Sequence, residues 1–393
     1  MSLKTLAPKT LFVLGISLLL AQPAMAQNEI TITKPTDIWG FPTVPVSISG
    51  FSGEILNVLR DDLSFMGIVD SPAEQAKYLI AGNGNGRVEG RVIERINKNQ
   101  LLAKAYNGGT TRAQTHAFAD DIAKVLTPNI PPIAQTKIAF KVETGGGNGE
   151  VYIADYDGVN ARAVTSDHSI IAAPCWAGHS ALYYTSYKLN YPFIFRHELA
   201  SGARQAISRF AGLNSSAAIS PDGRRLCMIL SKNGSPDVYV SNPDGSGLKQ
   251  LTFTREDESS PCWSPDNQTI CYVSRESGAA RLYAISATNG APRRIMTTGV
   301  INPTEPDWSP DGKWIAFTSQ ARDFTICIVK AQGGDAIPLV SGEDPSWAPN
   351  SRALLFCKGP DHEKNLCLLD VPTKRVKTIH RILESNSYPS WAK

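Results

Sequence analysis

Histidine is the side chain that most often binds metals or transfers protons near neutral pH, so the six histidines are the first candidates for chemistry. They are scattered along the chain without the short spacing that metal ligands need. The string "GHSAL" at 178–182 contains a histidine and a serine but lacks the second glycine of a nucleophile elbow. These residues predict neither a metal site nor a catalytic site; they are His116, His168, His179, His197, His362 and His380.

The seven cysteines could form disulfides or bind zinc. Their number is odd, so at least one has no partner within the chain, and the absence of a CxxC motif or a Cys/His cluster argues against zinc. Cys262 and Cys271 flank one predicted hairpin, so a disulfide between them is one expectation. The alternative is that they serve as small buried hydrophobic residues. The full set is Cys175, Cys227, Cys262, Cys271, Cys327, Cys357 and Cys367.

Two further strings resemble ligand sites only in part. "GNGNG" at 82–86 looks like a phosphate loop, but no Lys-Ser or Lys-Thr follows it and the next element reads as a strand. "DYDG" at 155–158 begins like a calcium loop, but the later ligands and the final glutamate are missing, which favours a turn. We therefore expect no metal and no other cofactor.

The N-terminus has the layout of a secretory signal peptide. Lys4 and Lys9 precede the apolar run "LFVLGISLLLA", and "AMA" at 24–26 supplies a small-residue cleavage site. As a helix the run would span roughly 16 Å, too little for a bilayer core of about 30 Å. The sequence predicts a signal peptide over 1–26, cleavage after Ala26, and an exported, soluble protein that does not span a membrane.

Length and composition set the scale of the fold. The chain has 393 residues, enough for two domains or one large one, and its 31 glycines and 26 prolines suit many turns and few long helices. Its net charge is only +3. This balance offers no basic patch for nucleic acid, so no nucleic-acid partner is expected.

A repeated hairpin determines how these side chains are positioned. The stretch "EPDWSPDGKWIAFTSQ" at 305–320 joins a tryptophan, a Ser-Pro-Asp-Gly turn and an alternating apolar run. Related stretches recur with a period of roughly 43 residues, which indicates a propeller or a solenoid. The residues at the tryptophan position are Trp176, Ile219, Trp263, Trp308, Trp347 and Trp391.

Each period contains four short strands joined by turns, and the strands are apolar on both faces. Such sheets must pack between neighbours, and a ring of them leaves no open end. The first set of strands, from Ile138, lacks an anchor strand, whereas the last anchor at 388–391 has nothing after it. We expect the C-terminal "YPSW" to complete the first blade and to close a ring of six blades. The anchor tryptophans and Pro-Asp-Gly turns are then structural.

Residues 27–130 lack the repeat and read as a small α/β domain. Strands are predicted at 44–49 and 77–82, a hairpin over 86–106, and helices at 53–67 and 111–127. Pro131 and Pro132 begin a stiff linker at 131–137. The predicted fold is therefore mainly β: a small α/β domain followed by a six-bladed β-propeller over 138–393.

This organisation resembles the TolB family, periplasmic proteins of the Tol–Pal envelope system. The strings "IAFK" at 138 and "VYIADYDGVNARAVT" at 151 are similar to the first blade of the family. "RHELASGARQAISRFAGLNSSAAISPDGRRLCMILSKNGSPDVYV" is similar to its second-to-third blade segment. The helix that carries Arg112, His116 and Asp120 looks like the family's domain junction. The resemblance covers nearly the whole mature chain.

The resemblance implies a scaffold that binds proteins, with the peptidoglycan-associated lipoprotein Pal docked on the propeller face over the central channel. The loops of that face follow each fourth strand and join each second strand to the third, whereas the Pro-Asp-Gly turns lie on the other face. Several residues in the loops of this face are acidic, and Glu256 is one of them. A partner with basic or amide groups would bind such a face, although acids in loops are often only solvated. The docking residues expected are Gly212, Leu213, Asn214, Asp257, Glu258, Ser259, Ser260, Glu305, Glu343 and Asp344.

The N-terminal segment of the mature chain is the second expected contact. The resemblance implies that it engages a TolA-like inner-membrane protein. The segment is short, polar and prone to form a strand, so it could pair with a partner's sheet, fold back on its own domain, or fray. Its residues are Glu29, Ile30, Thr31, Ile32 and Thr33.

The expected function is therefore non-enzymatic: a monomeric periplasmic scaffold that supports outer-membrane integrity and cell division. The alternative is a periplasmic propeller enzyme, such as a metal-dependent oligosaccharide lyase or a hydrolase. A peptidase with this kind of propeller would need a further domain of roughly 200 residues, and the chain has no room for one.

Overall fold

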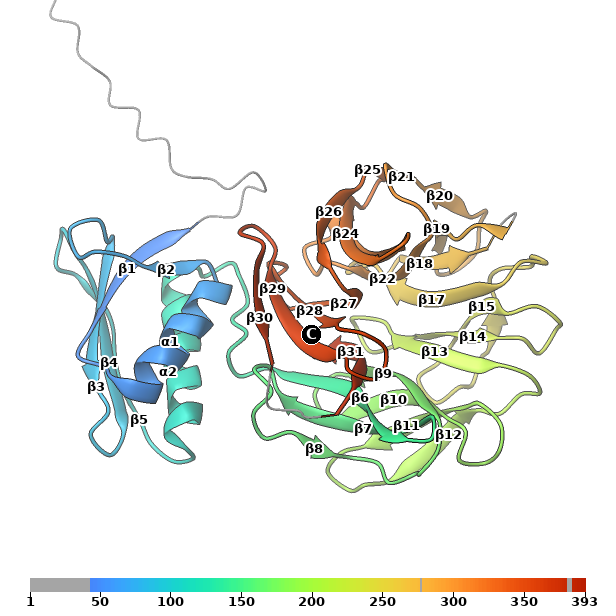
Figure 1. Ribbon diagram of the computed structural model, residues 1–393, viewed down its shortest axis with the longest axis horizontal. Helices are drawn as coiled ribbons and strands as arrows, with labels where there is room; N and C mark the ends of the chain where they lie inside the picture. Colours follow the sequence, from blue (N-terminus) through green and yellow to red (C-terminus); the bar gives the residue numbers. More distant parts are fainter. Residues whose placement is uncertain (1–42, 276–277, 380–383) are drawn as a thin grey trace, which may run out of the picture. The chain divides into compact units, whose positions relative to one another are not determined.

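Each period of the repeat folds into one four-stranded antiparallel sheet, because its strands are short, apolar and joined by turns. The structure, a computed structural model, describes residues 43–275, 278–379 and 384–393. Within these residues six such sheets form the blades of a β-propeller (Figure 1). The fold class and the number of blades predicted from the sequence are thereby confirmed. The described residues belong to one compact unit, Thr36–Lys393.

The blades are numbered in chain order. From inner to outer strand, blade 1 consists of β31 (Asn386–Trp391), β6 (Lys137–Gly145), β7 (Asn148–Asp155) and β8 (Arg162–Ala163). In the same order, blade 2 consists of β9 (Ile171–Ala177), β10 (Ala181–Ser186), β11 (Phe193–Glu198) and β12 (Arg204–Ser208). Blade 3 consists of β13 (Asn214–Ile219), β14 (Leu226–Leu230), β15 (Asp237–Ser241) and β16 (Lys249–Gln250). Blade 4 is β17 (Glu258–Trp263), β18 (Thr269–Ser274), β19 (Arg281–Ser286) and β20 (Arg293–Ile295); blade 5 is β22 (Pro303–Trp308), β23 (Trp314–Gln320), β24 (Phe324–Lys330) and β26 (Ile337–Ser341); blade 6 is β27 (Glu343–Trp347), β28 (Ala353–Lys358), β29 (Asn365–Asp370) and β30 (Arg375–Thr378). A short parallel pair, β21 (Thr297–Thr298) with β25 (Gly334–Asp335), connects a segment after β20 to one before β26.

The two ends of the propeller sequence meet in blade 1, as predicted. β31 pairs with β6 in a register that sets Trp391 opposite Ile138. The indole Nε1 of Trp391 also donates a hydrogen bond of 2.8 Å to Thr136 Oγ1, just before β6. The C-terminal strand therefore closes the ring with both backbone and side-chain bonds.

Adjacent blades are held together by apolar side chains on both faces of each sheet. Separate hydrophobic clusters lie between blades 1 and 2, 2 and 3, 3 and 4, 4 and 5, and 5 and 6. The anchor tryptophans contribute to these contacts and also bond across them. Trp176 Nε1 donates to Ser390 O at 3.1 Å, and Trp263 Nε1 donates to Ala218 O at 2.9 Å. The anchors are thus structural.

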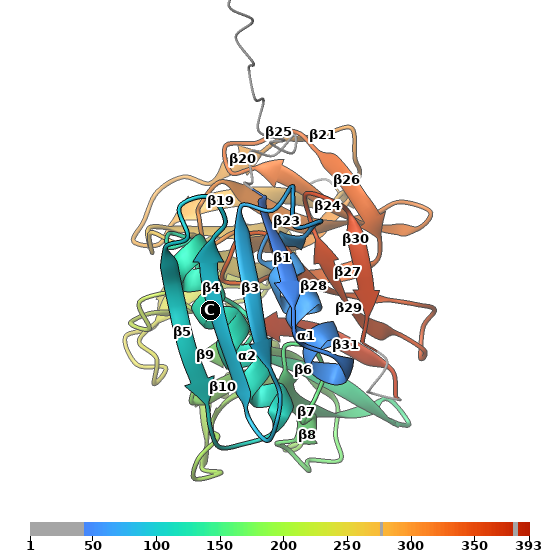
Figure 2. The same ribbon diagram turned by 90° about the vertical axis from the view of Figure 1, so that its left-hand side faces the viewer.

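The front part is a five-stranded sheet with two helices. Its strand order is β2-β1-β3-β4-β5, from β1 (Val44–Ser49), β2 (Ile68–Asp70), β3 (Tyr78–Asn83), β4 (Val88–Glu94) and β5 (Gln100–Tyr106). Helices α1 (Gly53–Phe65) and α2 (Thr111–Leu126) lie on one face of it (Figure 2). β2, a short strand parallel to β1, is the element that the sequence did not predict. Val125, near the end of α2, is 37% exposed. No helix among the described residues is both long and apolar enough to cross a bilayer.

One hydrophobic cluster continues from this sheet into blades 6 and 1. It joins Phe65 at the end of α1 and Ile133 after α2 to Trp391 and Leu368 of the blades. The segment after α2 is fixed by Asp120, whose Oδ1 accepts a 2.8 Å hydrogen bond from Ala134 N. The front part and blades 6 and 1 therefore share one hydrophobic core.

Candidate docking face of the propeller

Each inner strand contains the same backbone irregularity. At one residue the backbone enters the left-handed region, with φ from 48° to 55°, and the pairing with the next strand shifts register. Residues other than glycine rarely adopt this conformation, so its repetition in six blades is a property of the architecture. We call these residues the bulge ring: Ala173, Ser216, Ser260, Glu305, Asp344 and Tyr388.

The bulge ring surrounds a cavity of about 490 Å³ at one end of the central channel. This end opens on what we call the loop face, which carries the connections from each outer strand to the next inner strand and from each second strand to the third. Four residues predicted from the sequence line the cavity, namely Leu213, Ser260, Glu305 and Asp344. Tyr388 also lines it but was not expected to.

Two carboxyl groups of the ring interact directly. Glu305 Oε2 accepts hydrogen bonds from Thr318 Oγ1 at 2.6 Å and from Asp344 N at 3.2 Å. Asp344 Oδ2 in turn accepts from Tyr388 N at 3.0 Å. Burial, together with the negative charge of Glu305, raises the pKa of Asp344 well above its usual range. Ionisation of Asp344 is therefore disfavoured in this hollow.

The loop before β13 is held by Asn214, a predicted docking residue whose side chain is fully buried. Its Oδ1 accepts from Ser208 Oγ at 2.6 Å and from Phe210 N at 3.0 Å, and its Nδ2 donates to Phe210 O at 2.8 Å. Gly212 has φ 85°, and a Cβ there would collide with Ser231 Oγ. Asn214 and Gly212 therefore shape this loop, and Leu213 is the residue of the three that reaches the cavity.

The remaining predicted acids differ in exposure. Glu258 is 2% exposed and accepts a 2.9 Å hydrogen bond from Thr254 Oγ1, and Glu343 forms an ion pair with Lys364. Asp257 is exposed, whereas Ser259 is half-buried in β17. The structure thus uses several of the expected acids inside the protein, which sequence alone did not indicate.

Large exposed apolar side chains gather on the loop face. They lie in its connections or at the cavity mouth, and their exposed fractions range from 38% to 77%. Scattered single apolar residues are normal on a surface, but a set concentrated on one face indicates an interaction site. The set is Ile170, Leu189, Tyr191, Phe210, Phe253, Ile301, Phe324 and Tyr388.

The opposite end of the channel differs. There the Pro-Asp-Gly turns and four anchor tryptophans line a cavity of about 810 Å³. The turns are locked by short side-chain bonds, such as Ser220 Oγ to Asp222 Oδ1 at 2.5 Å and Ser309 Oγ to Asp311 Oδ1 at 2.6 Å. We call this end of the propeller the turn face. Polar side chains of its turns form hydrogen bonds with one another.

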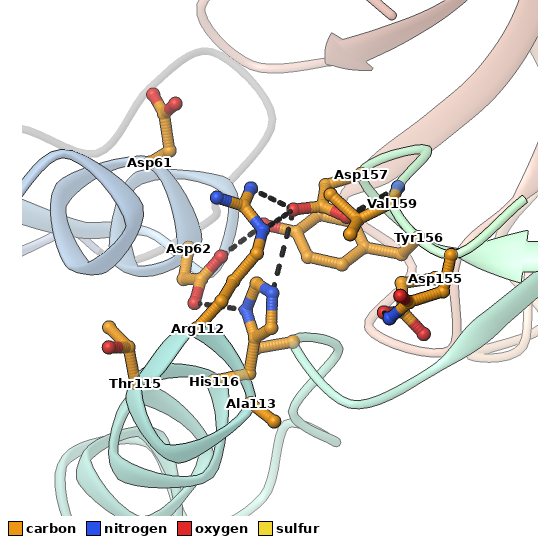
Figure 3. A network of polar contacts seen from close by, with 12 residues as sticks. Asp61, Asp62, Arg112, Ala113, Thr115, His116, Asp155, Tyr156, Asp157 and Val159 are labelled. Carbon is orange, nitrogen blue, oxygen red and sulfur yellow. Dashed lines mark hydrogen bonds and ion pairs between the residues drawn. The ribbon is translucent and has the colours of Figure 1, made fainter. Parts of the chain in front are cut away.

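A polar network lies where the helices meet blade 1 (Figure 3). His116 Nδ1 on α2 is 2.7 Å from Asp62 Oδ2 on α1, and its Nε2 is 3.5 Å from Asp157 Oδ2 in the turn after β7. Arg112 Nε donates to the same Asp157 oxygen at 2.9 Å, and the Tyr156 hydroxyl donates to Asp62 Oδ1. Asp157 comes from the "DYDG" string, so this aspartate of the incomplete calcium pattern is bound by cations of α2.

The charges in this network stabilise one another. Burial alone would lower the pKa of His116, but hydrogen bonds to Asp157 and Asp62 raise it to about 9. Burial likewise opposes ionisation of Asp157, but His116 and Arg112 outweigh it and hold its pKa well below the usual range. The network is therefore a clamp in which a protonated histidine bridges α1, α2 and blade 1.

The expected disulfide is not formed. Cys262 and Cys271 do lie directly opposite each other in β17 and β18, as the hairpin predicted, but all seven cysteines are free thiols. A hydrogen bond between the two thiols, together with burial, raises the pKa of Cys262 well above its usual range. Both therefore serve as small buried residues, the alternative stated for them.

The predicted N-terminal contact, Glu29 to Thr33, and the signal peptide over 1–26 lie outside the described residues. They remain predictions.

Comparison with known proteins identifies the family. The model described as the TolB beta propeller domain matches residues 126–393. Curated proteins named Tol-Pal system protein TolB, from Francisella tularensis subsp. tularensis (strain WY96-3418) and subsp. mediasiatica (strain FSC147), are 29% and 30% identical over 257 residues. These alignments cover 62% of this chain, which spans only 59% of the length of either relative.

Solved structures show the same fold. The crystal structure of TolB from Acinetobacter baumannii matches with a TM-score of 0.76 at 22% identity and covers 90% of this chain and 97% of that one. A chain of a nidogen/laminin complex matches with a TM-score of 0.54 at 14% identity, covering 66% and 98%. The second match shows that the propeller alone is widely shared, whereas the first also includes the α/β part. Since the family model covers most of the sequence, the chain belongs to the TolB family.

Proposed function

We propose that the chain is a non-enzymatic periplasmic scaffold of the Tol–Pal system. Its loop face docks the peptidoglycan-associated lipoprotein Pal, and the N-terminal segment of the mature chain engages a TolA-like inner-membrane protein. In this role the protein, exported by a signal peptide cleaved after Ala26, supports outer-membrane integrity and cell division. Membership of the TolB family, whose curated relatives carry the Tol-Pal name, supports this proposal.

One observation carries the choice of the loop face. The loop face combines a hollow at the channel mouth with exposed apolar side chains such as Ile301 and Tyr388. Exposed apolar side chains concentrated on one face are typical of a protein-binding site. The turn face has a larger cavity, but its turns are rigid and their polar groups bond to one another.

The acid pair suggests how the partner is recognised. Burial and the negative charge of Glu305 oppose ionisation of Asp344, and Glu305 Oε2 accepts hydrogen bonds in the same hollow. An amide side chain offers both a donor and an acceptor and so complements the pair without a desolvated charge. We infer that the lipoprotein presents amide or basic groups to this hollow.

The test is calorimetric titration of the mature chain with the purified lipoprotein of the same organism. Ile301→Asp places a charge in the exposed apolar set without disturbing the core, since Ile301 is 56% exposed. A charge at the centre of an interface weakens binding by roughly tenfold or more. Ile96→Asp is the matched control, because Ile96 is 75% exposed in the turn between β4 and β5.

The proposal predicts that Ile301→Asp weakens the complex and Ile96→Asp does not. Equal affinity for both variants and the parent chain would exclude the loop face as the docking site.

A further inference from the structure

Four neighbouring connections on the loop face, around blades 2 and 3, alternate exposed apolar residues with cations. The connections are 187–192, 209–213, 231–236 and 253–257. Their exposed apolar residues are Leu189, Tyr191, Phe210 and Phe253, and their cations are Lys188, Arg209, Lys232 and Arg255, all of them exposed. We call these eight residues the loop-tip patch.

Contacts between neighbouring residues connect the four loops into one surface. The ring of Tyr191 stacks on the ring of Phe193, with 6.2 Å between the ring centres. Phe193 is the first residue of β11, and β11 pairs with β12, which ends two residues before Phe210. The ammonium group of Lys232 lies 4.4 Å from the centre of the Phe210 ring. Ser235 Oγ donates to Thr254 O at 2.7 Å and so ties the third loop to the fourth. The patch is therefore contiguous.

Most of the cations in the loop-tip patch have no acidic partner in the part of the chain that the structure describes. The first three connections contain no acidic residue, and the fourth contains Glu256 and Asp257. Among the described residues, Arg209 and Arg255 form no ion pair, and Lys232 contacts aromatic rings. Lys188 pairs with Asp167 at 3.2 Å, and this aspartate is itself buried beneath the loops. An approaching surface therefore meets mainly positive charge.

The shape of the patch distinguishes it from the channel mouth. None of its residues lines the cavity that the bulge ring surrounds. Phe253 and Tyr191 are 77% and 63% exposed, so they project singly from loop tips and do not form a groove into which a folded partner would fit. A fluid surface needs no such shape complementarity. Aromatic rings prefer the headgroup level of a bilayer, and lysine and arginine next to it bind lipid phosphates.

We propose that the loop-tip patch binds the surface of a phospholipid bilayer that contains anionic headgroups. The rings of Tyr191, Phe210 and Phe253 enter the headgroup region, and the four cations contact phosphate groups. This binding is independent of the lipoprotein, and it orients the loop face, including the channel mouth, toward the membrane.

The test is flotation of the mature chain with large unilamellar vesicles. One set contains phosphatidylethanolamine and phosphatidylglycerol, and the other contains only phosphatidylcholine. We expect the chain to float with the anionic vesicles at low salt and to be released as ionic strength rises, because screening shortens the reach of the charges. Equal recovery with both vesicle types, or no flotation with either, would overturn the proposal.

Substitutions separate the two kinds of contact. The double variant Tyr191→Ser with Phe253→Ser removes the most exposed rings and should strongly reduce flotation at low salt, where the parent chain binds. The double variant Arg209→Gln with Arg255→Gln removes two positive charges but keeps polar side chains, and it should weaken the vesicle affinity by about fivefold for each cation removed. Ile96→Ser is the control, since Ile96 is equally exposed and is followed two residues later by Lys98.

The outcome also distinguishes this proposal from the docking of the lipoprotein. Ile301→Asp should lose the lipoprotein and float normally, whereas the patch variants should float poorly. If the patch variants float like the parent chain but fail to bind the lipoprotein, the patch belongs to the protein interface and the bilayer proposal is wrong.

Discussion

The clamp at the junction and the loop face of the propeller use similar residue types in opposite ways. In the clamp, carboxylates, a histidine and an arginine are buried, and each charge is bonded to another. On the loop face, cations and apolar rings are exposed, as is Asp257, whereas Glu258 accepts a hydrogen bond inside the protein. Groups that are satisfied internally stabilise a fold, whereas groups left available at the surface can bind a partner. The comparison thus separates architecture from function within one chain.

The largest expected effect is in the clamp. Asp157→Ala would leave the charges of Arg112 and His116 without their shared carboxylate, whose side chain is only 1% exposed. Loss of one partner from a buried ion pair costs about 3–5 kcal/mol of unfolding free energy. Urea denaturation measures this change, and binding by the loop face should persist at concentrations where the variant is folded.

Asp155→Ala is the matched control for this prediction. Asp155 lies two residues earlier and pairs with Lys137, whose side chain is half exposed. Its loss should cost no more than about 1 kcal/mol. Equal costs for the two variants would refute the idea that burial of the clamp matters.

The next effect concerns a side chain of the loop face that is buried like those of the clamp. Asn214→Ala removes the side chain that holds the loop from Phe210 to Gly212, and leaves partly buried main-chain groups without these partners. The expected loss is about 1–3 kcal/mol of unfolding free energy. Because the loop borders the channel mouth, lipoprotein affinity should fall as well. A variant with the stability and the affinity of the parent chain would contradict this role of Asn214.

An effect of comparable size is expected from pH. The folded-state pKa of His116 is about 9 against an ordinary value of 6.5. Its stabilisation, roughly 3 kcal/mol, is therefore complete below pH 6.5 and is lost as pH rises through 9. Thermal unfolding should show Tm falling by about 5 °C or more over this window. In His116→Gln, which cannot titrate, this part of the pH dependence should disappear, and an unchanged profile would exclude His116 as its source.

The smallest effect on stability is expected on the loop face. Phe253→Ser removes a side chain that is 77% exposed, so the unfolding free energy should change by less than about 0.5 kcal/mol. Denaturation curves of this variant and the parent chain should coincide. A loss above about 1 kcal/mol would mean that Phe253 packs against the protein and is not available at the surface.

The architecture was predictable because its signals are periodic and local. The tryptophan anchors and Pro-Asp-Gly turns recur at a nearly fixed spacing. The last anchor, at Trp391, has no strands after it, and this predicted that it pairs with the strand of Ile138 and closes the ring. The bulge ring was missed, although the prolines that follow five of its six members, as at Pro306 and Pro345, are a signal that could have indicated it. β2 was missed because its three residues are too short for a pattern.

The site was less predictable because burial and long-range pairing leave no local trace. Glu258 and Asp257 are adjacent in sequence, yet one is buried and the other exposed. Asp62 and Asp157 come together only in the fold, through His116. The resemblance identified the helix of Arg112 and His116 as the junction, but the partners of these residues required the structure.

Hydrogen exchange of the mature chain with and without the lipoprotein tests the central claim most directly. If the loop face is the docking face, the complex protects amides in the connections 209–213, 299–302 and 341–345. The turns 220–223 and 309–312 on the opposite face should exchange as in the free chain. Protection confined to those turns would contradict the assignment of the docking face.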